Sequence, residues 1–187
     1  MSKTVWKPGT MLYPQPPAMV SCGTWENPNI ITIAWTGIVC TDPAMTYISV
    51  RPERYSYNII KEQKEFVINL TTNRLIYQAD LCGVKSGREI KKFDIKGITP
   101  ERASVVNVPL IKEAPVNLEC IVEKIIPLGT HDMFLSRIVA VNADDALFDS
   151  KGVFHLEKSG LVAASHGKYY ELGRQVGSFG FSVRKKK

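Results

Sequence analysis

Alternation between apolar and polar residues is clearest in the second half of the chain. Residues 116–123 place an apolar side chain at every second position, and residues 133–141 repeat much of this pattern. Because successive side chains of a strand point to opposite faces of a sheet, both segments are predicted to be strands. The sequence Pro-Leu-Gly-Thr-His-Asp of residues 127–132 suits a hairpin connection between them.

The first half predicts shorter elements. A strand over residues 18–25 and a second over residues 30–35 flank the turn signal Asn27-Pro28-Asn29, which predicts a hairpin. A loop is expected over residues 36–43. The remaining predicted elements are strands at 45–50 and 65–70, helices at 55–63 and 75–81, a helical turn at 89–93 and a loop with a short edge strand at 100–115.

At least six strands with two or three short helices predict a mainly β fold, an antiparallel barrel with helical insertions. A chain of 187 residues fits one domain. We therefore expect residues 1–187 to form a single domain. Its proline-rich residues 1–17 are predicted to be an extended N-terminal arm, and residues 181–187 a basic tail.

The positive charge of the chain is concentrated at its end. Arg184, Lys185, Lys186 and Lys187 supply four of the six net charges, which leaves +2 on the rest. A nucleic-acid-binding protein is expected to carry a basic face with interleaved aromatic residues, and the sequence shows none, so nucleic acid is not an expected partner. No apolar run approaches the ~20 residues of a membrane span, and the start lacks a signal-peptide pattern. A cytoplasmic protein without membrane contact is expected.

Common catalytic and metal-binding motifs are missing from the sequence. The four cysteines have no CxxC spacing and are expected to be free thiols. The three histidines are too dispersed to predict a metal site. GxGxxG, HExxH and GxSxG are all absent. If the protein is an enzyme, we therefore expect a bound cofactor to supply its chemistry.

The segment of residues 29–37 predicts a strand whose two faces differ in kind. Ile31, Ile33 and Trp35 are expected on one face as core residues, and the opposite face carries only small side chains, those of Thr32, Ala34 and Thr36. A flat ring could lie close to the backbone on this small-residue face. An apolar strand then ends in Arg51 and Arg54, with Ser56 near a predicted helix start, where a phosphate could bind. A flat ring beside a phosphate site suggests flavin mononucleotide, FMN.

Four segments together resemble the flavin reductase-like family with an FMN-binding split barrel, which includes the flavoredoxins. They are residues 29–37, 49–56, 82–93 and 129–135, and the resemblance covers roughly residues 10–175. It implies a six-stranded antiparallel split barrel of Greek-key type. It also implies a homodimer with the flavin near the subunit interface.

The resemblance also assigns roles to residues. Flavin contacts are implied for Trp35, Thr36, Gly37, Ser49, Val50 and Arg51, and phosphate contacts for Arg54, Tyr55, Ser56, Gly83, Lys85, Ser86 and one of Lys91 and Lys92. His131 is the implied catalytic residue, although Thr130 stands before it where the family has an acidic residue. Plainer interpretations stay open: a core Trp35, a solvated cluster at Arg51–Arg54, a flexible basic loop at 83–92 and a solvated His131. Tyr169 and Tyr170 are equally compatible with covering the flavin or a partner subunit and with being ordinary strand residues.

The implied function is that of an oxidoreductase that passes electrons from NAD(P)H through bound FMN to a flavin, a ferric complex or a redox protein. An electron carrier is the alternative: it would hold FMN, lack a nicotinamide site and be reduced by a protein partner. A third interpretation is a flavin- or phosphate-binding module without redox turnover. The sequence shows no nicotinamide fingerprint that would separate the first two.

Overall fold

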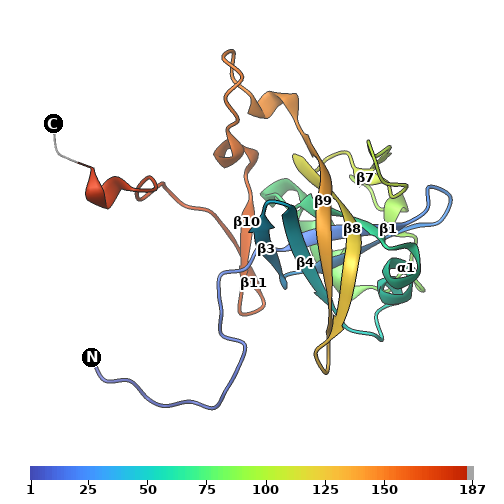
Figure 1. The fold of residues 1–187 in the computed structure, drawn as a ribbon, viewed down its shortest axis with the longest axis horizontal. Helices are drawn as coiled ribbons and strands as arrows, with labels where there is room; N and C mark the ends of the chain where they lie inside the picture. Colours follow the sequence, from blue (N-terminus) through green and yellow to red (C-terminus); the bar gives the residue numbers. More distant parts are fainter. Residues whose placement is uncertain (185–187) are drawn as a thin grey trace.

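A seven-stranded antiparallel sheet forms the centre of the molecule (Figure 1). The computed structural model describes residues 1–184, so Lys185–Lys187 of the predicted basic tail lie outside the described residues. The sheet order is β2-β1-β5-β8-β9-β4-β3. The strands are β1 Ala18–Gly23, β2 Pro28–Ile33, β3 Thr36–Thr41, β4 Ala44–Val50, β5 Glu65–Leu70, β8 Val116–Pro127 and β9 Asp132–Ala143.

The sheet has one strand more than predicted. Residues 36–43 were expected to be a loop, but residues 36–41 form β3, which pairs with β4 at the register Gly37↔Tyr47. β3 is largely exposed on both faces, so its sequence lacks the alternation by which a half-buried strand is recognised. In the part of the chain that the structure describes, β2 and β3 are the two sheet edges and do not pair, so the barrel is open at this side.

The β1–β2 hairpin confirms the predicted pairing of the first two strands, with Ala18 opposite Ile33 and Gly23 opposite Pro28. The first strand ends at Gly23 instead of Trp25. Gly23 has φ +87°, and a Cβ atom there would lie 2.3 Å from the main-chain oxygen of Asn27. Only glycine fits this turn, because other residues meet both the steric clash and the left-handed backbone.

Both helices pack against the β1–β2 part of the sheet. α1 spans Tyr55–Gln63, as predicted, and ends where Lys64 adopts a left-handed conformation. α2 spans Ile76–Val84 and packs on β2. The helical turn predicted at 89–93 is instead η2 at Lys92–Asp94. The remaining elements are η1 Asn73–Leu75, β6 Pro100–Glu101, β7 Leu110–Ile111, η3 Asp145–Leu147, η4 Leu156–Ser159, β10 Val162–Ser165, β11 Lys168–Glu171 and η5 Phe181–Val183.

The main core lies between the curved sheet and α1. Phe66, Phe134 and Ile48 are fully buried there, and Tyr57 and Ile60 of α1 join them. A second core, which includes Met19, lies under α2 on the other face of β1. This explains why all six residues of β1 are buried, since each face of the strand has its own cover.

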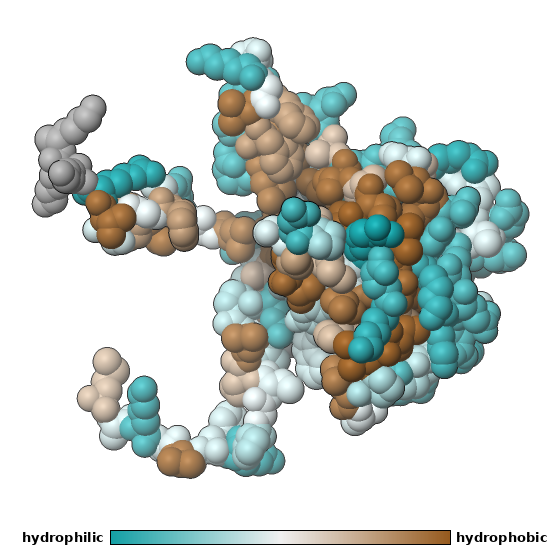
Figure 2. Space-filling view, in the orientation of Figure 1, coloured by the Kyte–Doolittle hydropathy of each residue, from teal (hydrophilic) through white to brown (hydrophobic). Residues whose placement is uncertain are grey.

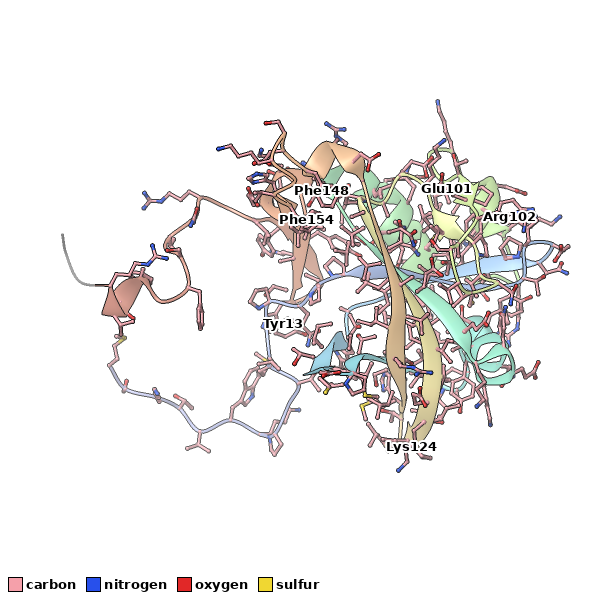
Figure 3. The ribbon with its side chains drawn as sticks, turned by 45° about the horizontal axis from the view of Figure 1, so that its top comes forward. Tyr13, Glu101, Arg102, Lys124, Phe148 and Phe154 are labelled. Atoms are coloured by element: carbon pink, nitrogen blue, oxygen red, sulfur yellow. The ribbon has the colours of Figure 1, made fainter. Side chains whose placement is uncertain are left out.

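Both ends of the chain leave the body of the molecule on the same side (Figure 1). The N-terminal arm is tied down near its end by the bridge between Gln15 and Ala164, and the ring of Tyr13 contacts His166. β10 and β11 form a separate two-stranded sheet at this side. A short excursion after η3 is closed by Phe148 and Phe154, whose ring centroids lie 5.1 Å apart (Figure 3).

The structure describes no helix long and apolar enough to cross a membrane. All four cysteines are free thiols, and Cys22, Cys82 and Cys120 are buried. Within residues 1–184, no three metal-ligating side chains gather into a metal site.

Candidate functional site

A pocket opens where the sheet is not closed. This main pocket has a volume of about 480 Å³ and is lined by residues 31–35, by Ser49, Val50, Arg51, Glu53 and Arg54, and by His131. β4 pairs with β9 so that Val50 lies opposite Asp132. This register brings His131, which is 80 residues further along the chain, next to Arg51 at the mouth of the pocket.

A second pocket adjoins the first. This side pocket has a volume of about 250 Å³ and shares Ile31, Glu53 and Arg54 with the main pocket. Its other walls come from the start of α1, the end of α2 and the loop of residues 84–89. We refer to the two pockets together as the groove.

Trp35 and His131 form an aromatic pair at one end of the groove. Their ring centroids lie 4.5 Å apart with a tilt of 39°. The prediction that Trp35 shares a core face with Ile31 and Ile33 is wrong, because β2 ends at Ile33 and the chain bends before Trp35. The opposite face, which carries Thr32, is not fully open to a flat ring either. The Thr32 hydroxyl donates a hydrogen bond to the main-chain oxygen of Ala79 in α2 at 2.6 Å.

His131 is held as a neutral base by its surroundings. Loss of solvent lowers the pKa of its imidazole, and the Arg51 guanidinium lowers it further, while Glu53 acts in the opposite direction. Arg51 and Glu53 pair with each other at 3.4 Å on the exposed rim. The Thr130 hydroxyl lies 3.0 Å from His131 Nδ1, so it holds one ring nitrogen while Nε2 remains available.

The hairpin that carries His131 is anchored to α1 by a residue that sequence reasoning missed. The Tyr57 hydroxyl donates to the Asp132 carboxylate at 2.5 Å, and this bond raises the pKa of Tyr57. The Tyr57 ring also packs edge-on against Phe134. No local signal predicts the bond, because its partners are 75 residues apart.

Lys92 places a buried cation at the floor of the side pocket. Its side chain is only 3% exposed, and its ammonium donates to the main-chain oxygens of Ile30 at 2.7 Å and Cys82 at 2.6 Å. Burial lowers the pKa of Lys92. Burial also raises the pKa of the Cys82 thiol to about 11, so no thiolate neutralises the lysine. No carboxylate within residues 1–184 forms an ion pair with it.

A buried cation with carbonyl partners alone is costly unless an anion compensates it. An ammonium has three protons, and the carbonyls of Ile30 and Cys82 take two of them. The side pocket is the solvent-accessible space that Lys92 lines. The arrangement therefore favours an anionic group in this pocket.

Further groups that bind anions gather around the side pocket. Arg54 Nη2 donates to the Gly83 main-chain oxygen at 2.8 Å, which joins the start of α1 to the end of α2. The buried Ser56 hydroxyl accepts a hydrogen bond from Asn29 Nδ2 at 2.7 Å. Lys85 and Glu89, which are four residues apart in the chain, form an ion pair at 3.2 Å.

Gly87 lets the loop of residues 84–89 close against α1. A Cβ atom at Gly87 would lie 2.4 Å from both Asn29 Oδ1 and the Tyr55 ring, so a larger residue would push the loop away. Arg88, the next residue, places its guanidinium 5.4 Å from the centroid of the Tyr55 ring. The loop thus brings a second arginine to the rim of the side pocket.

The structure brings most of the predicted site residues to the groove. The main pocket contains Trp35, Ser49, Val50, Arg51, Arg54 and His131, and the side pocket Arg54, Tyr55, Ser56, Lys85, Ser86 and Lys92. Four predicted residues do not line it. Thr36 and Gly37 belong to β3, Gly83 contributes only the carbonyl that Arg54 binds, and Lys91 is exposed elsewhere.

Groove residues that the sequence did not single out include Glu53, Arg88 and Cys82, and Asn29 contacts the groove residue Ser56 from behind. Glu53 stands inside the quoted Arg-Pro-Glu-Arg segment, so its place in the sequence was a usable signal. Asn29 and Cys82 also begin quoted segments, but their contacts depend on the packing of β2 against α2 and α1, which the sequence does not show. Tyr169 and Tyr170 lie on β11 outside the groove, and Tyr169 donates to Asp80 at 3.1 Å.

Comparison with solved structures defines the class of protein. The chain is similar to the flavoredoxin of Desulfovibrio vulgaris (Miyazaki F), with 27% identity, a TM-score of 0.88 and coverage of 98% of this chain and 100% of the flavoredoxin. It also shares its fold with the FMN-binding protein from Thermus thermophilus, at 22% identity, a TM-score of 0.78 and coverage of 95% and 98%. The fold is a flavin reductase-like split barrel.

Sequence comparison then identifies the family. The family model of the flavin reductase like domain matches residues 10–163. An uncharacterised protein of Archaeoglobus fulgidus is 33% identical over 159 residues, which cover 85% of this chain and 88% of that protein. The chain belongs to the flavin reductase-like family.

Proposed function

We propose that the protein binds FMN in the groove and acts as an oxidoreductase. The observation that carries this proposal is the buried, unneutralised charge of Lys92 beneath a pocket that adjoins a larger one. A ligand with a planar ring and an anionic end satisfies both pockets. FMN has this shape, and the similar protein from Thermus thermophilus is an FMN-binding protein.

The phosphate of FMN would be held in the side pocket. A phosphate monoester carries about −1.5 to −2 charges near neutral pH, which matches Lys92 together with Arg54. Ser56 and Ser86 line the same pocket and can donate from their hydroxyls. Lys92 rather than Lys91 is the phosphate ligand in this proposal, because Lys92 alone of the two lines the pocket.

The ring system would occupy the main pocket. Val50 and Ile31 supply apolar wall, and Trp35 with His131 closes one end. FMN, when bound, supplies the acceptance of hydride from a nicotinamide and the onward transfer of electrons. His131, kept neutral at pH 7 by its lowered pKa, can accept or position a hydrogen bond at the rim without adding charge.

In the leading form of the proposal, NAD(P)H is the electron donor. The acceptor is then a free flavin, a ferric complex or a redox protein. A homodimer and a single FMN-binding domain belong to the same proposal. Membership of the flavin reductase-like family supports this oxidoreductase class. An NADH:FAD oxidoreductase of Streptomyces globisporus has the same fold, at 17% identity and a TM-score of 0.73.

An FMN electron carrier without a nicotinamide site is the second candidate. The similarity to the Desulfovibrio vulgaris flavoredoxin over nearly the whole chain favours it. In this form a protein partner would deliver electrons to the bound flavin. His131 would then contribute to the flavin environment but not to a nicotinamide site.

One experiment tests both candidates. The purified protein is expected to show a flavin absorption spectrum or to gain one with added FMN. Anaerobic addition of NADH or NADPH should then bleach the spectrum rapidly if the protein is a reductase. A yellow protein that neither nucleotide reduces supports the carrier, and a colourless protein that binds no added FMN rejects both.

A further inference from the structure

A third pocket adjoins the main pocket at Trp35. It has a volume of about 330 Å³ and shares Trp35 and Ser49 with the main pocket. Tyr47 of β4 and residues 9–12 and 15 of the N-terminal arm supply its other walls. We call it the arm pocket. Pockets of about 300 Å³ or more are large enough to hold small organic molecules.

The N-terminal arm is anchored to the body of the molecule beside this pocket. Gln15 N donates to the main-chain oxygen of Ala164 at 2.9 Å, and Ala164 N donates to the main-chain oxygen of Gln15 at 2.7 Å. The ring of Tyr13 packs against His166, with the ring centroids 4.6 Å apart (Figure 3). Figure 2 shows hydrophobic residues both on the arm and on the face of the body that the arm leaves. The anchor therefore fixes where the apolar residues of the arm meet the body.

The wall that the sheet contributes to the arm pocket is also fixed. Tyr47 and Ser49 are two residues apart on β4, so their side chains point to the same face of the strand, opposite to the buried Ile48. Ser49 N donates to the main-chain oxygen of Trp35 at 2.9 Å, which holds the bend after β2 against β4. The boundary between the arm pocket and the main pocket is thus set by contacts within the sheet.

None of the described residues that line the arm pocket is charged. Met11, Leu12 and Trp35 supply apolar surface, and the other side chains are neutral. The main pocket, in contrast, carries two arginines and a glutamate. Because transfer of an ionised group into an uncharged pocket is costly, the arm pocket favours a neutral ligand over an anionic nucleotide or an anionic ferric complex.

The side-chain amide of Gln15 gives the arm pocket a polar group without a partner. Its Oε1 is buried, and no group within residues 1–184 donates a hydrogen bond to it. A buried acceptor without a donor is unfavourable. A ligand hydroxyl in the arm pocket would supply the missing donor, and Gln15 Nε2 can donate to a ligand carbonyl.

We propose that the arm pocket binds the electron acceptor, and that this acceptor is a neutral planar compound of the quinone class. This inference rests on the proposed function, because an acceptor beside Trp35 needs a reduced flavin in the main pocket. A quinone gains two electrons and two protons and becomes a hydroquinone, and reduced FMN supplies both electrons and both protons. Gln15 suits both forms, since Nε2 donates to a quinone oxygen and Oε1 accepts from a hydroquinone hydroxyl.

The binding test uses duroquinone, a neutral quinone whose ring has no free position for reaction with thiols. NMR titration of its methyl signal with the full-length chain, with and without FMN, gives the dissociation constant. L12D places a charge in the pocket wall and is expected to raise this constant by about tenfold or more. Q15L keeps the size of the side chain but removes the amide, and should raise the constant about threefold to tenfold.

V5D is the matched control for L12D. It adds the same charge to an arm residue that is 98% exposed and does not line the arm pocket, so it should bind duroquinone like the wild type. A wild type that does not bind duroquinone would overturn the proposal. So would L12D and Q15L variants that bind it as tightly as the wild type.

Reoxidation kinetics then test the acceptor role. The FMN-loaded protein is reduced with dithionite, and stopped-flow absorbance follows its anaerobic reoxidation by duroquinone or by ferricyanide. Ferricyanide is an anion that the neutral pocket does not favour, so L12D and Q15L should slow duroquinone about fivefold or more relative to ferricyanide. Absence of FMN binding by the wild type rejects the proposed function and the acceptor role with it. Intact FMN binding with equal slowing of both oxidants rejects the acceptor role alone.

Discussion

The ammonium of Lys92 donates a hydrogen bond to the main-chain oxygen of Ile30, 2.7 Å away and 62 residues earlier in the chain. This contact ties the loop after α2 to the edge strand β2 and buries a positive charge between them. The adjoining lysine, Lys91, is exposed. Two neighbouring residues of the same type therefore have opposite environments, which gives a matched pair for experiment.

Replacing Lys92 by methionine is expected to weaken FMN binding at least tenfold. Hydrogen bonds that involve charged groups are worth about 1.5–3 kcal/mol, which exceeds the 1.4 kcal/mol of a tenfold change. Isothermal titration with FMN measures the effect, and K91M is the control, expected to bind within about twofold of the wild type. Equal weakening in both variants would mean that general charge, not this buried site, binds the phosphate.

The double variant R54A/S56A is expected to weaken FMN binding while the fold is kept. Arg54 and Ser56 both line the side pocket. Loss of their donors removes one charge-assisted contact and one neutral one, so the dissociation constant should rise by at least tenfold. The exposed α1 pair N58A/K61A is the control. Fluorescence quenching of FMN gives the affinity, and an unchanged value would place the phosphate elsewhere.

For His131, H131A should slow flavin reduction by NAD(P)H much more than it weakens FMN binding. His131 sits at the rim of the main pocket, whereas the buried cation lies in the side pocket. Stopped-flow absorbance measures the reduction rate, and titration measures the affinity. Equal reduction rates in variant and wild type would remove His131 from the mechanism.

Removal of the Arg51 charge should change the pKa of His131. Loss of solvent lowers the pKa of this histidine first, and Arg51 adds to the effect, so R51Q is expected to raise the pKa toward its ordinary value of 6.5. Because a lowered pKa favours the neutral form in the fold, the wild type should lose stability as the pH falls through 6.5 toward the folded value. Histidine NMR titration measures the shift. E53Q is the opposite control and should lower the pKa further.

His155 makes the excursion after η3 sensitive to pH. Its Nε2 lies 3.1 Å from Asp149 and its Nδ1 2.9 Å from Glu157, and only the imidazolium can donate to both. These bonds raise the pKa of His155, with Asp149 as the larger cause, and lower the pKa of Asp149 to about 2. The contribution of His155 to stability is therefore complete below pH 6.5 and is lost as the pH rises through its folded pKa.

The melting temperatures of wild type and H155Q should accordingly differ most at pH 6 and converge at higher pH. H166Q, a substitution at an exposed histidine, serves as the control. A difference between wild type and H155Q that does not change with pH would show that His155 acts only by packing.

Glu119 is a fully buried carboxylate whose loss should destabilise the whole fold. It accepts from the main-chain N–H groups of Ser104, Val105 and Val106 and from Asn142 Nδ2, at 2.7–2.9 Å. Burial alone would raise the pKa of Glu119, but these donors outweigh it and lower the pKa below 4.5. Its contribution to stability is therefore present above pH 4.5 and lost as the pH falls through the folded pKa.

Substitution E119Q places an amide N–H₂ opposite main-chain donors and should cost about 2 kcal/mol or more. E123Q removes only an exposed pair with Arg137 and should cost less than about 1 kcal/mol. Urea unfolding at pH 7 compares the two variants. Similar midpoints for both would contradict the role of Glu119.

Local pattern was enough to determine the strands and helices that bury one face. The β1–β2 hairpin has a clear turn signal and the β8–β9 pair a clear alternation, and these elements and α1 were each predicted within a few residues. β3 was missed because both its faces are largely exposed, so no period distinguishes it from a loop. β10 and β11 are only four residues each, too short for a period to show.

The sequence, through its resemblance to the family, also predicted most of the residues that line the candidate groove. Arg51, Lys91, Lys92 and His131 were all predicted site residues. The sequence could not say which of the two lysines is buried, or which of these residues lie in contact. Those answers came from tertiary structure, because the strand register of β4 and β9 sets His131 beside Arg51, and the packing of α2 on β2 buries Lys92. Periodicity records the environment of each side chain along its own element, whereas a site depends on contacts between elements distant in sequence.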